Sequence, residues 1–186
     1  MDTKLIIVRG GGATGKTALA RKLVADTGFE SFLKDEFKEI EFDKLGRKPR
    51  ASEMKKLESL SWQKTYDAVA EAIDKDKSII IEGNFMAPQK REIVKLLNNE
   101  VEVYEVYCFV RNWSAFKRYV YRNRSGERHP GHKDHIFYPI VLLEAFSGLF
   151  GYRPYKPFKL SDKFLEVDTS DFLKVDYQKI LKFIKS

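Results

Sequence analysis

The feature that most constrains the fold of this chain is a glycine-rich stretch close to its start, GGGATGKT at residues 10–17. A short apolar run, residues 3–9, precedes it, and a segment with helical spacing, residues 16–27, follows it. Apolar, β-rich runs bounded by glycine are typical of buried parallel strands. Gly28 suits the position just after a helix. The stretch therefore predicts a strand that turns directly into a helix.

This stretch matches the pattern G-x-x-x-x-G-K-[ST] in the context that the pattern requires. Glycines let successive backbone N–H groups point inward around an anion, and the following helix adds its free N–H donors. Lys16 suits the β- and γ-phosphates of a nucleotide, and the Thr17 hydroxyl suits Mg²⁺ as a ligand. The predicted nucleotide-binding residues are Gly10, Gly11, Gly12, Ala13, Thr14, Gly15, Lys16, Thr17 and Ala18. Because the sequence has no Asn-Lys-x-Asp segment of the kind that binds guanine, we expect the nucleotide to be ATP rather than GTP. With the Mg²⁺ expected at Thr17, the predicted cofactors are ATP and Mg²⁺.

Strand-like and helix-like segments alternate along the rest of the chain. The predicted strands after the first two are residues 77–84, 101–110 and 162–168. The predicted later helices are residues 61–73, 88–99, 113–124 and 171–185. Asp171 is the expected N-cap of the last helix. This alternation predicts an α/β fold with a mostly parallel sheet covered on both faces. The length of 186 residues favours a single domain, residues 1–186.

Composition narrows the class of protein. The single cysteine, Cys108, excludes an internal disulfide framework and fits a reducing compartment. No apolar run approaches the roughly 18 residues of a membrane span. We therefore predict a cytoplasmic protein without a membrane segment. The formal net charge of +7 fits an anionic ligand, either nucleotide phosphates or a nucleic acid, or simply a lysine-rich surface.

An acidic residue follows the expected second strand, which we predict to end near Leu33. Asp35 would then lie at the carboxyl edge of the sheet, where ligands bind in open α/β folds. A carboxylate there can accept the proton of a substrate hydroxyl during phosphoryl transfer. The alternative is that Asp35 is the N-cap of a helix beginning at Glu36. Both interpretations stay open from the sequence.

The segment IIIEGNF, residues 79–85, resembles a Walker B strand that ends in an acid. We expect Glu82 to hold Mg²⁺ through water or to contact substrate. Asn84 and Phe85 are expected on the floor of an acceptor pocket. The alternative is a buried strand whose polar end meets solvent.

Five arginines lie close together at positions 111, 118, 122, 124 and 128. Arg118 and Arg122 are four residues apart and so share one helix face. Guanidinium groups suit phosphate oxygens and the charge that develops during transfer. We predict a lid around residues 118–135, in which His132 contacts the acceptor or the phosphates. The alternative is a solvated basic face.

These motifs together resemble P-loop kinases of the nucleoside and small-molecule group, in particular zeta-toxin-like kinases, chloramphenicol phosphotransferase and the kinase domain of polynucleotide kinases. GGGATGKT, KDEFKE, IIIEGNF, the Arg118 and Arg122 helix, and LEVDTSD near the end carry the resemblance. The resemblance implies a three-layer P-loop NTPase fold with a five-stranded parallel sheet in the order 2-3-1-4-5. It also implies that Asp35 activates the acceptor and that Thr169 belongs to the segment passing the adenine. Glu82-Gly83-Asn84 departs from the Asp-x-Thr/Asn that the family often has.

The predicted function is a phosphotransferase that moves the γ-phosphoryl group of ATP to a hydroxyl of a small molecule. Asp35, Lys16, Arg118 and Arg122 are the predicted catalytic residues, and Asp35, Glu82, Asn84 and His132 are the predicted substrate contacts. One alternative is a polynucleotide 5′-hydroxyl kinase, which is less favoured because the chain has no aromatic-rich basic stripe. The other is a nucleotide-binding switch or ATPase that phosphorylates no acceptor.

Overall fold

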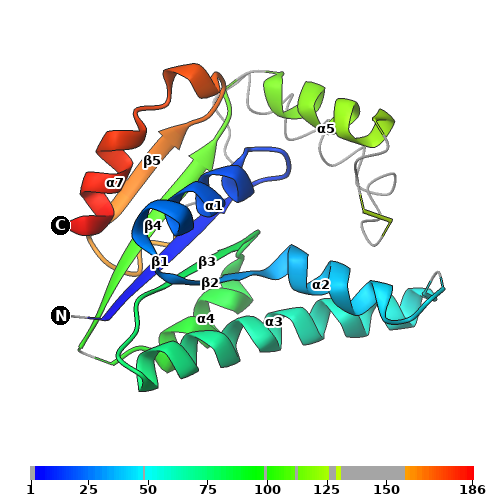
Figure 1. The fold of residues 1–186 in the computed structure, drawn as a ribbon, viewed down its shortest axis with the longest axis horizontal. Coiled ribbons are helices and arrows are strands. Elements are labelled where there is room, and N and C mark those ends of the chain that lie inside the picture. Colours follow the sequence, from blue (N-terminus) through cyan, green and yellow to red (C-terminus); the bar gives the residue numbers. More distant parts are fainter. Residues whose placement is uncertain (1–2, 48, 99, 112, 126–128, 131–157) are drawn as a thin grey trace.

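The computed structural model describes residues 3–47, 49–98, 100–111, 113–125, 129–130 and 158–186. A parallel sheet forms its centre, with strands in the order β2-β3-β1-β4-β5. The strands are β1 (Thr3–Gly10), β2 (Glu30–Leu33), β3 (Ile79–Gly83), β4 (Val101–Phe109) and β5 (Phe164–Asp168). This confirms the predicted strand order. The carboxyl ends of the strands therefore lie along one edge of the sheet (Figure 1).

Helices cover both faces of the sheet, so the fold has three layers (Figure 1). The helices are α1 (Lys16–Thr27), α2 (Lys34–Asp43), α3 (Ala51–Asp74), α4 (Ala87–Leu96), α5 (Ser114–Arg124), the 3-10 turn η1 (Phe172–Lys174) and α7 (Tyr177–Lys185). Because alternate strand residues point to opposite faces, each face has its own hydrophobic core. Ile6 and Val8 pack toward α1 and α7, whereas Leu5 and Ile7 pack toward α3 and α4.

The starts of α3 and of the last helix differ most from those predicted. Helix α3 begins ten positions before the predicted residue 61, because Met54 and Leu57 pack against Phe42 of α2 in a small separate cluster. Asp171 caps η1 rather than the last helix, and Asp176 accepts a hydrogen bond from the Lys179 N–H to cap α7. The prediction that Asp171 caps the last helix is therefore wrong, because that helix begins six residues later, at Tyr177.

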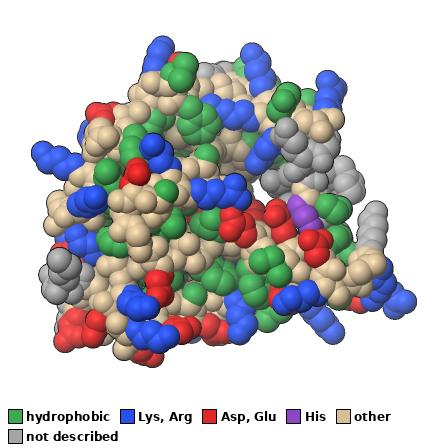
Figure 2. Space-filling view, viewed as in Figure 1, with side chains coloured by type: hydrophobic (Ala, Val, Ile, Leu, Met, Phe, Trp, Pro, Cys, Tyr) green, Lys and Arg blue, Asp and Glu red, His purple; other side chains and the backbone are tan. Residues whose placement is uncertain are grey.

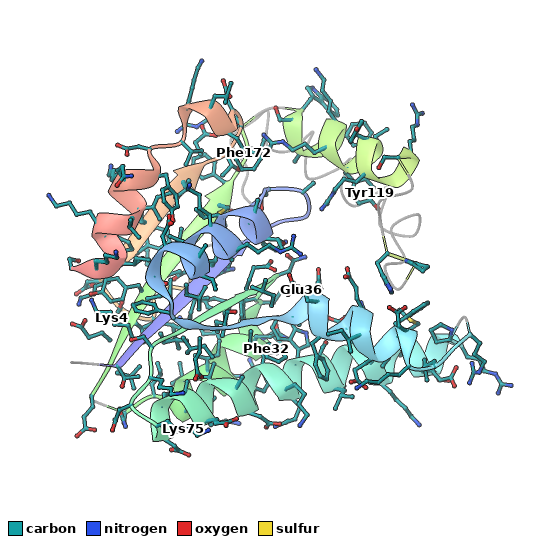
Figure 3. All side chains as sticks on the ribbon, viewed as in Figure 1. Lys4, Phe32, Glu36, Lys75, Tyr119 and Phe172 are labelled. Atoms are coloured by element: carbon teal, nitrogen blue, oxygen red, sulfur yellow. The ribbon has the colours of Figure 1, made fainter. Side chains whose placement is uncertain are left out.

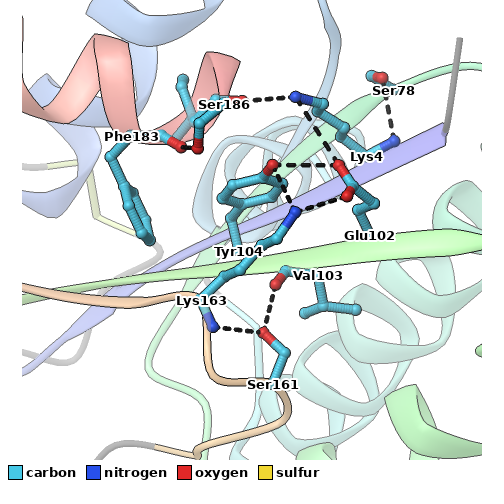
Figure 4. A network of polar contacts seen from close by, with 10 residues as sticks. Lys4, Ser78, Glu102, Val103, Tyr104, Ser161, Lys163, Phe183 and Ser186 are labelled. Atoms are coloured by element: carbon cyan, nitrogen blue, oxygen red, sulfur yellow. Dashed lines mark hydrogen bonds and ion pairs between the residues drawn. The ribbon is translucent and has the colours of Figure 1, made fainter.

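The amino ends of the strands carry a polar network opposite the predicted site (Figure 4). Glu102 lies 2.5 Å from Lys163 and 3.9 Å from Lys4, and Tyr104 donates to Glu102 at 3.1 Å. These contacts fasten β1, β4 and the start of β5 to one another. They hold the register of these strands. Because they lie at the amino ends, the carboxyl edge of the sheet stays available for ligands.

Among the described residues, no helix is long and apolar enough to cross a membrane. The predicted lid lies only partly within the described residues, which include 118–125 and 129–130 but neither 126–128 nor 131–135. His132 is outside them, and the placement of the lid stays a prediction.

Candidate active site

The glycine-rich stretch forms the loop between β1 and α1, at the carboxyl edge of the sheet. Gly10 must be glycine because a Cβ there would lie 2.3 Å from the Cys108 carbonyl oxygen. Gly15 has a left-handed backbone, with φ +80°, directly before the first turn of α1. The Thr14 hydroxyl donates to the Gly11 carbonyl at 2.9 Å and braces the loop from inside. The loop thus has the close-packed backbone of a phosphate-binding loop.

A buried carboxylate from β3 meets the end of this loop. Glu82 is 1% exposed, its Oε1 lies 3.4 Å from Lys16 Nζ, and its Oε2 accepts from the Thr17 hydroxyl at 3.2 Å. Burial raises the pKa of Glu82, and the nearby charge of Asp35 raises this pKa further, against the opposing effects of Lys16 and Thr17. The prediction that Glu82 belongs to the phosphate and metal region therefore has a geometric basis. The alternative of a strand end that meets solvent is wrong.

Asp35 lies in the first turn of α2, at the carboxyl end of β2. The N-cap of this helix is Leu33, so the alternative in which Asp35 caps a helix beginning at Glu36 is wrong. Asp35 Oδ1 lies 3.0 Å from Lys34 Nζ, and Leu33, two residues before Asp35, pairs with Glu82 across β2 and β3. The fold therefore brings the predicted base to the same edge as the phosphate-binding loop.

Arg118 of α5 contacts the loop that follows β5. Its Nη2 donates to the Thr169 carbonyl at 2.7 Å and to the Ser170 carbonyl at 3.1 Å. Its guanidinium also lies 4.3 Å from the centroid of the Phe172 ring. Thr169 in turn donates to the Thr14 carbonyl at 2.6 Å, so this loop joins α5 to the phosphate-binding loop. Arg118 fastens the predicted adenine-side segment in this conformation.

A cavity of about 410 Å³ lies beside the phosphate-binding loop. It is lined by Ala13, Gly15, Ala18, Lys117, Arg118, Tyr121, Arg122 and Phe172. Figure 3 shows Phe172 in η1, the turn that follows β5 in the chain. Its ring covers Gly15 so closely that a Cβ on Gly15 would lie 1.9 Å from Cζ. Phe172 was not anticipated from the sequence, since a lone phenylalanine after a strand carries no motif.

The two polar and aromatic residues after β3 have different environments. Asn84 is half-buried, and its Oδ1 is a buried acceptor without a hydrogen-bond partner among the described residues. Phe85 is completely buried against Trp62 and Phe158, so the expectation that its side chain lines a pocket is wrong. The ring of Trp62 lies over Gly83, where a Cβ would be 3.2 Å from Cη2.

A histidine and several carboxylates lie where α2 faces the end of α5 (Figure 2). His129 Nε2 lies 2.9 Å from Asp43 Oδ1, and its ring packs edge-on against Phe42. Within the part of the chain that the structure describes, no group of three histidine, cysteine or acidic residues could hold a metal ion.

A buried ion pair underlies the site, and the sequence did not reveal it. Arg9 and Glu105 are 2% and 1% exposed, and their side chains meet at 3.1 Å. Arg9 Nη2 also donates to the Phe85 carbonyl, and Glu105 accepts from the Phe158 and Lys159 N–H groups. The one sequence signal for this ion pair was the charged residue Arg9, directly before the glycine-rich stretch. The pair ties the base of the loop to the end of β3.

Known structures share this architecture. A candidate kinase from Chloroflexus aurantiacus J-10-fl has 26% sequence identity and a TM-score of 0.87, over 100% of this chain and 98% of the other. A sugar kinase from Janibacter sp. HTCC2649 has 12% identity and a TM-score of 0.57, over 97% of this chain and 91% of the other. A gluconokinase from Sinorhizobium meliloti 1021 has 10% identity and a TM-score of 0.51, over 98% and 89%. The last two show the fold alone.

No curated protein matches the chain significantly. The family model described as Zeta toxin matches residues 2–139. This match spans the phosphate-binding loop, Asp35, Glu82 and the arginines of α5. The chain therefore belongs to the zeta toxin family and is a P-loop kinase.

Proposed function

We propose that this kinase transfers the γ-phosphoryl group of ATP, with Mg²⁺, to a hydroxyl of a small molecule. The observation that supports this best is the buried contact of Glu82 with both Lys16 and Thr17. A phosphate-binding lysine, a hydroxyl ligand and a carboxylate are the groups that a nucleotide–metal complex requires at one point. Transfer to a hydroxyl also requires a base that accepts the hydroxyl proton, and Asp35 supplies this base.

The residues present fit a magnesium ion. Glu82 Oε1 is buried without a hydrogen bond from the described residues, and Mg²⁺ prefers oxygen ligands of this kind. Thr17 and Glu82 would hold the ion, Thr17 directly and Glu82 directly or through water. When bound, the ion would neutralise charge on the phosphates. Lys16 would leave Glu82 for the β- and γ-phosphates, and the loop N–H groups would hold their oxygens.

The acceptor side is assigned to Asp35 and Asn84. Asp35 takes the proton of the acceptor hydroxyl as that oxygen attacks the γ-phosphorus. Asn84 offers a buried carbonyl oxygen that lacks a donor, and an acceptor hydroxyl would supply one. Arg122 lines the cavity beside the loop and stabilises the charge of the transferring group. When a nucleotide competes for the contacts of Arg118 with the loop after β5, Arg118 joins Arg122 beside the transferring group. His132 contacts the acceptor or the phosphates from the lid.

A sugar or sugar acid is the class of small molecule to test first, because two neighbours of this fold are a sugar kinase and a gluconokinase. A 5′-hydroxyl nucleic acid is the second candidate acceptor, supported only by the net charge of +7. We also propose that residues 1–186 form a single domain and that the protein is cytoplasmic.

The test measures phosphorylated product from ATP and Mg²⁺ with a panel of sugars, sugar acids, nucleosides, antibiotics and 5′-hydroxyl oligonucleotides. Wild type is compared with Lys16→Ala, Asp35→Asn and a matched control, Asp67→Asn, which changes an exposed acid of α3. We expect one acceptor class to be phosphorylated, Asp35→Asn to bind ATP without transferring phosphate, and Asp67→Asn to resemble wild type. ATP turnover that no acceptor stimulates, unchanged in Asp35→Asn, would instead indicate a switch or ATPase.

A further inference from the structure

Lys34, at the start of α2, is an almost completely buried lysine. It is 5% exposed, which is unusual for this residue type. Its Nζ lies 3.0 Å from Asp35 Oδ1 and 2.9 Å from Glu58 Oε1. The ammonium also lies 5.0 Å from the centroid of the Trp62 ring, within the range of a cation–π contact. Two carboxylates and one ring therefore fix the position of this charge.

The ammonium stays charged at neutral pH. Burial alone would lower the pKa of Lys34, but Asp35 and Glu58 outweigh this effect and raise the pKa above its ordinary value. Buried ion pairs gain little net stability, and an apolar side chain of similar length often does as well. Stability therefore does not explain why a charge, rather than a methionine, lies here.

Glu58 connects this lysine to the long helix α3. One oxygen of Glu58 accepts from Lys34 and the other accepts from Lys38, both at 2.9 Å. The contacts run from the 24-residue helix α3 through Glu58 and Lys34 to the Asp35 carboxylate. Lys38 shares the same glutamate through an ion pair of the same length. Of the two lysines, Lys34 is the one whose ammonium lies 3.0 Å from the carboxylate of the proposed base.

We propose that Lys34 is a positioning residue that holds the Asp35 carboxylate, through its Oδ1, in the orientation required to receive the acceptor proton. This inference rests on the proposed function. In the step served, the acceptor oxygen bonds to the γ-phosphorus, and the bond to the oxygen bridging to the β-phosphate breaks, with its electrons leaving on ADP. The hydroxyl proton passes to Asp35. A carboxylate displaced by about 1 Å can cost roughly a hundredfold in rate.

The sheet register places Asp35 close to the rest of the candidate site. Leu33, directly before Lys34, pairs with Glu82 across β2 and β3, so Asp35 lies at the edge of the sheet that carries the Glu82 carboxylate. The Asp35 side chain is 36% exposed, whereas the Lys34 side chain that contacts its Oδ1 is 6% exposed. Lys34 therefore offers a fixed positive charge to a carboxylate that is partly open to solvent.

The test compares Lys34→Met, Lys34→Arg and the matched control Lys38→Met. The readouts are kcat and KM for ATP, with water as the acceptor and with each panel compound that wild type phosphorylates. We expect Lys34→Met to lower kcat at least about tenfold with KM for ATP unchanged. Lys34→Arg should restore much of the rate, and Lys38→Met should stay within about twofold of wild type. A kcat that Lys34→Met leaves unchanged, or an equal loss in Lys38→Met, overturns the inference.

Crystal structures of wild type and Lys34→Met provide a second readout that needs no activity. We expect the Asp35 carboxylate to adopt a different rotamer in Lys34→Met, and an unchanged rotamer overturns the inference. If Asp35→Asn turns over as fast as wild type, the proposed role of Asp35 as base fails. The crystal structures then still decide whether Lys34 positions Asp35, so the two failures can be told apart.

Discussion

The hydroxyl of Thr169, in the loop after β5, lies 2.6 Å from the carbonyl oxygen of Thr14 in the phosphate-binding loop. The same hydroxyl is 2.9 Å from the Phe109 carbonyl at the end of β4. Thr169 is 1% exposed, so water cannot replace these contacts. The two loops that would enclose a nucleotide are thus joined by one buried side chain.

Replacing Thr169 with valine should weaken this connection without changing the side-chain volume much. The Thr14 carbonyl would lose a buried donor, which costs about 1–3 kcal/mol of unfolding free energy. We expect lower stability in urea together with weaker ATP binding by calorimetry. The matched control is Thr65→Val, at a buried threonine within α3 that donates to the Ser61 carbonyl. Unchanged ATP affinity in Thr169→Val would mean that the contact serves stability alone.

A steric relationship between Gly15 and Phe172 gives a second prediction. Gly15→Ala introduces a Cβ that would lie 1.9 Å from Phe172 Cζ, in addition to the strain of a left-handed backbone. We expect Gly15→Ala to destabilise the protein less in a Phe172→Ala background, with a coupling of about 1 kcal/mol or more. A double-mutant cycle in urea measures this coupling. If the losses of unfolding free energy in the two single variants simply add in the double variant, the Phe172 ring moves aside at no cost.

The sequence predicted much of this fold because its signals are local. The glycine stretch places β1, the loop and α1 within the first 27 residues, and the IIIEGNF segment marks β3 and Glu82. Lys34 and Arg9 were not predicted because each depends on a partner far along the chain, Glu58 and Glu105. A buried ion pair has no sequence period, so two charged residues in apolar surroundings look like surface residues until the sheet brings them together.

The buried pair of Arg9 and Glu105 should be sensitive to loss of either partner. Arg9→Met leaves Glu105 buried without its cation, and breaking such a pair costs about 3–5 kcal/mol. Urea unfolding measures this loss. The control is Arg21→Met, which breaks an exposed pair with Glu36 and should cost at most about 1 kcal/mol. Similar losses in the two variants would mean that the Arg9 pair is weaker than its burial indicates.

The raised pKa of Glu82 predicts a pH-dependent stability in the metal-free protein. A carboxyl whose pKa is higher when folded than when unfolded binds its proton more tightly in the folded state. Its contribution is therefore present at low pH and is lost as the pH rises from its ordinary value of 4.5 through the folded pKa. We expect the stability of Glu82→Gln relative to wild type to increase with pH over this range. Urea unfolding in EDTA checks this, and a difference independent of pH would contradict it.

The only cysteine offers a measure of how much nucleotide binding stabilises the protein around β4. Burial raises the pKa of Cys108 to about 12, and the residue is completely buried in β4, so its thiol should react with alkylating reagents only when the protein opens. Its carbonyl packs against Gly10 of the phosphate-binding loop, so ATP with Mg²⁺ should slow the labelling further by stabilising the closed protein. Mass spectrometry during iodoacetamide labelling follows both effects. Leu173→Cys, at a side chain that is 96% exposed, supplies an internal control thiol that should react at once. Labelling of Cys108 as fast as that control would mean that β4 opens near the phosphate-binding loop under native conditions.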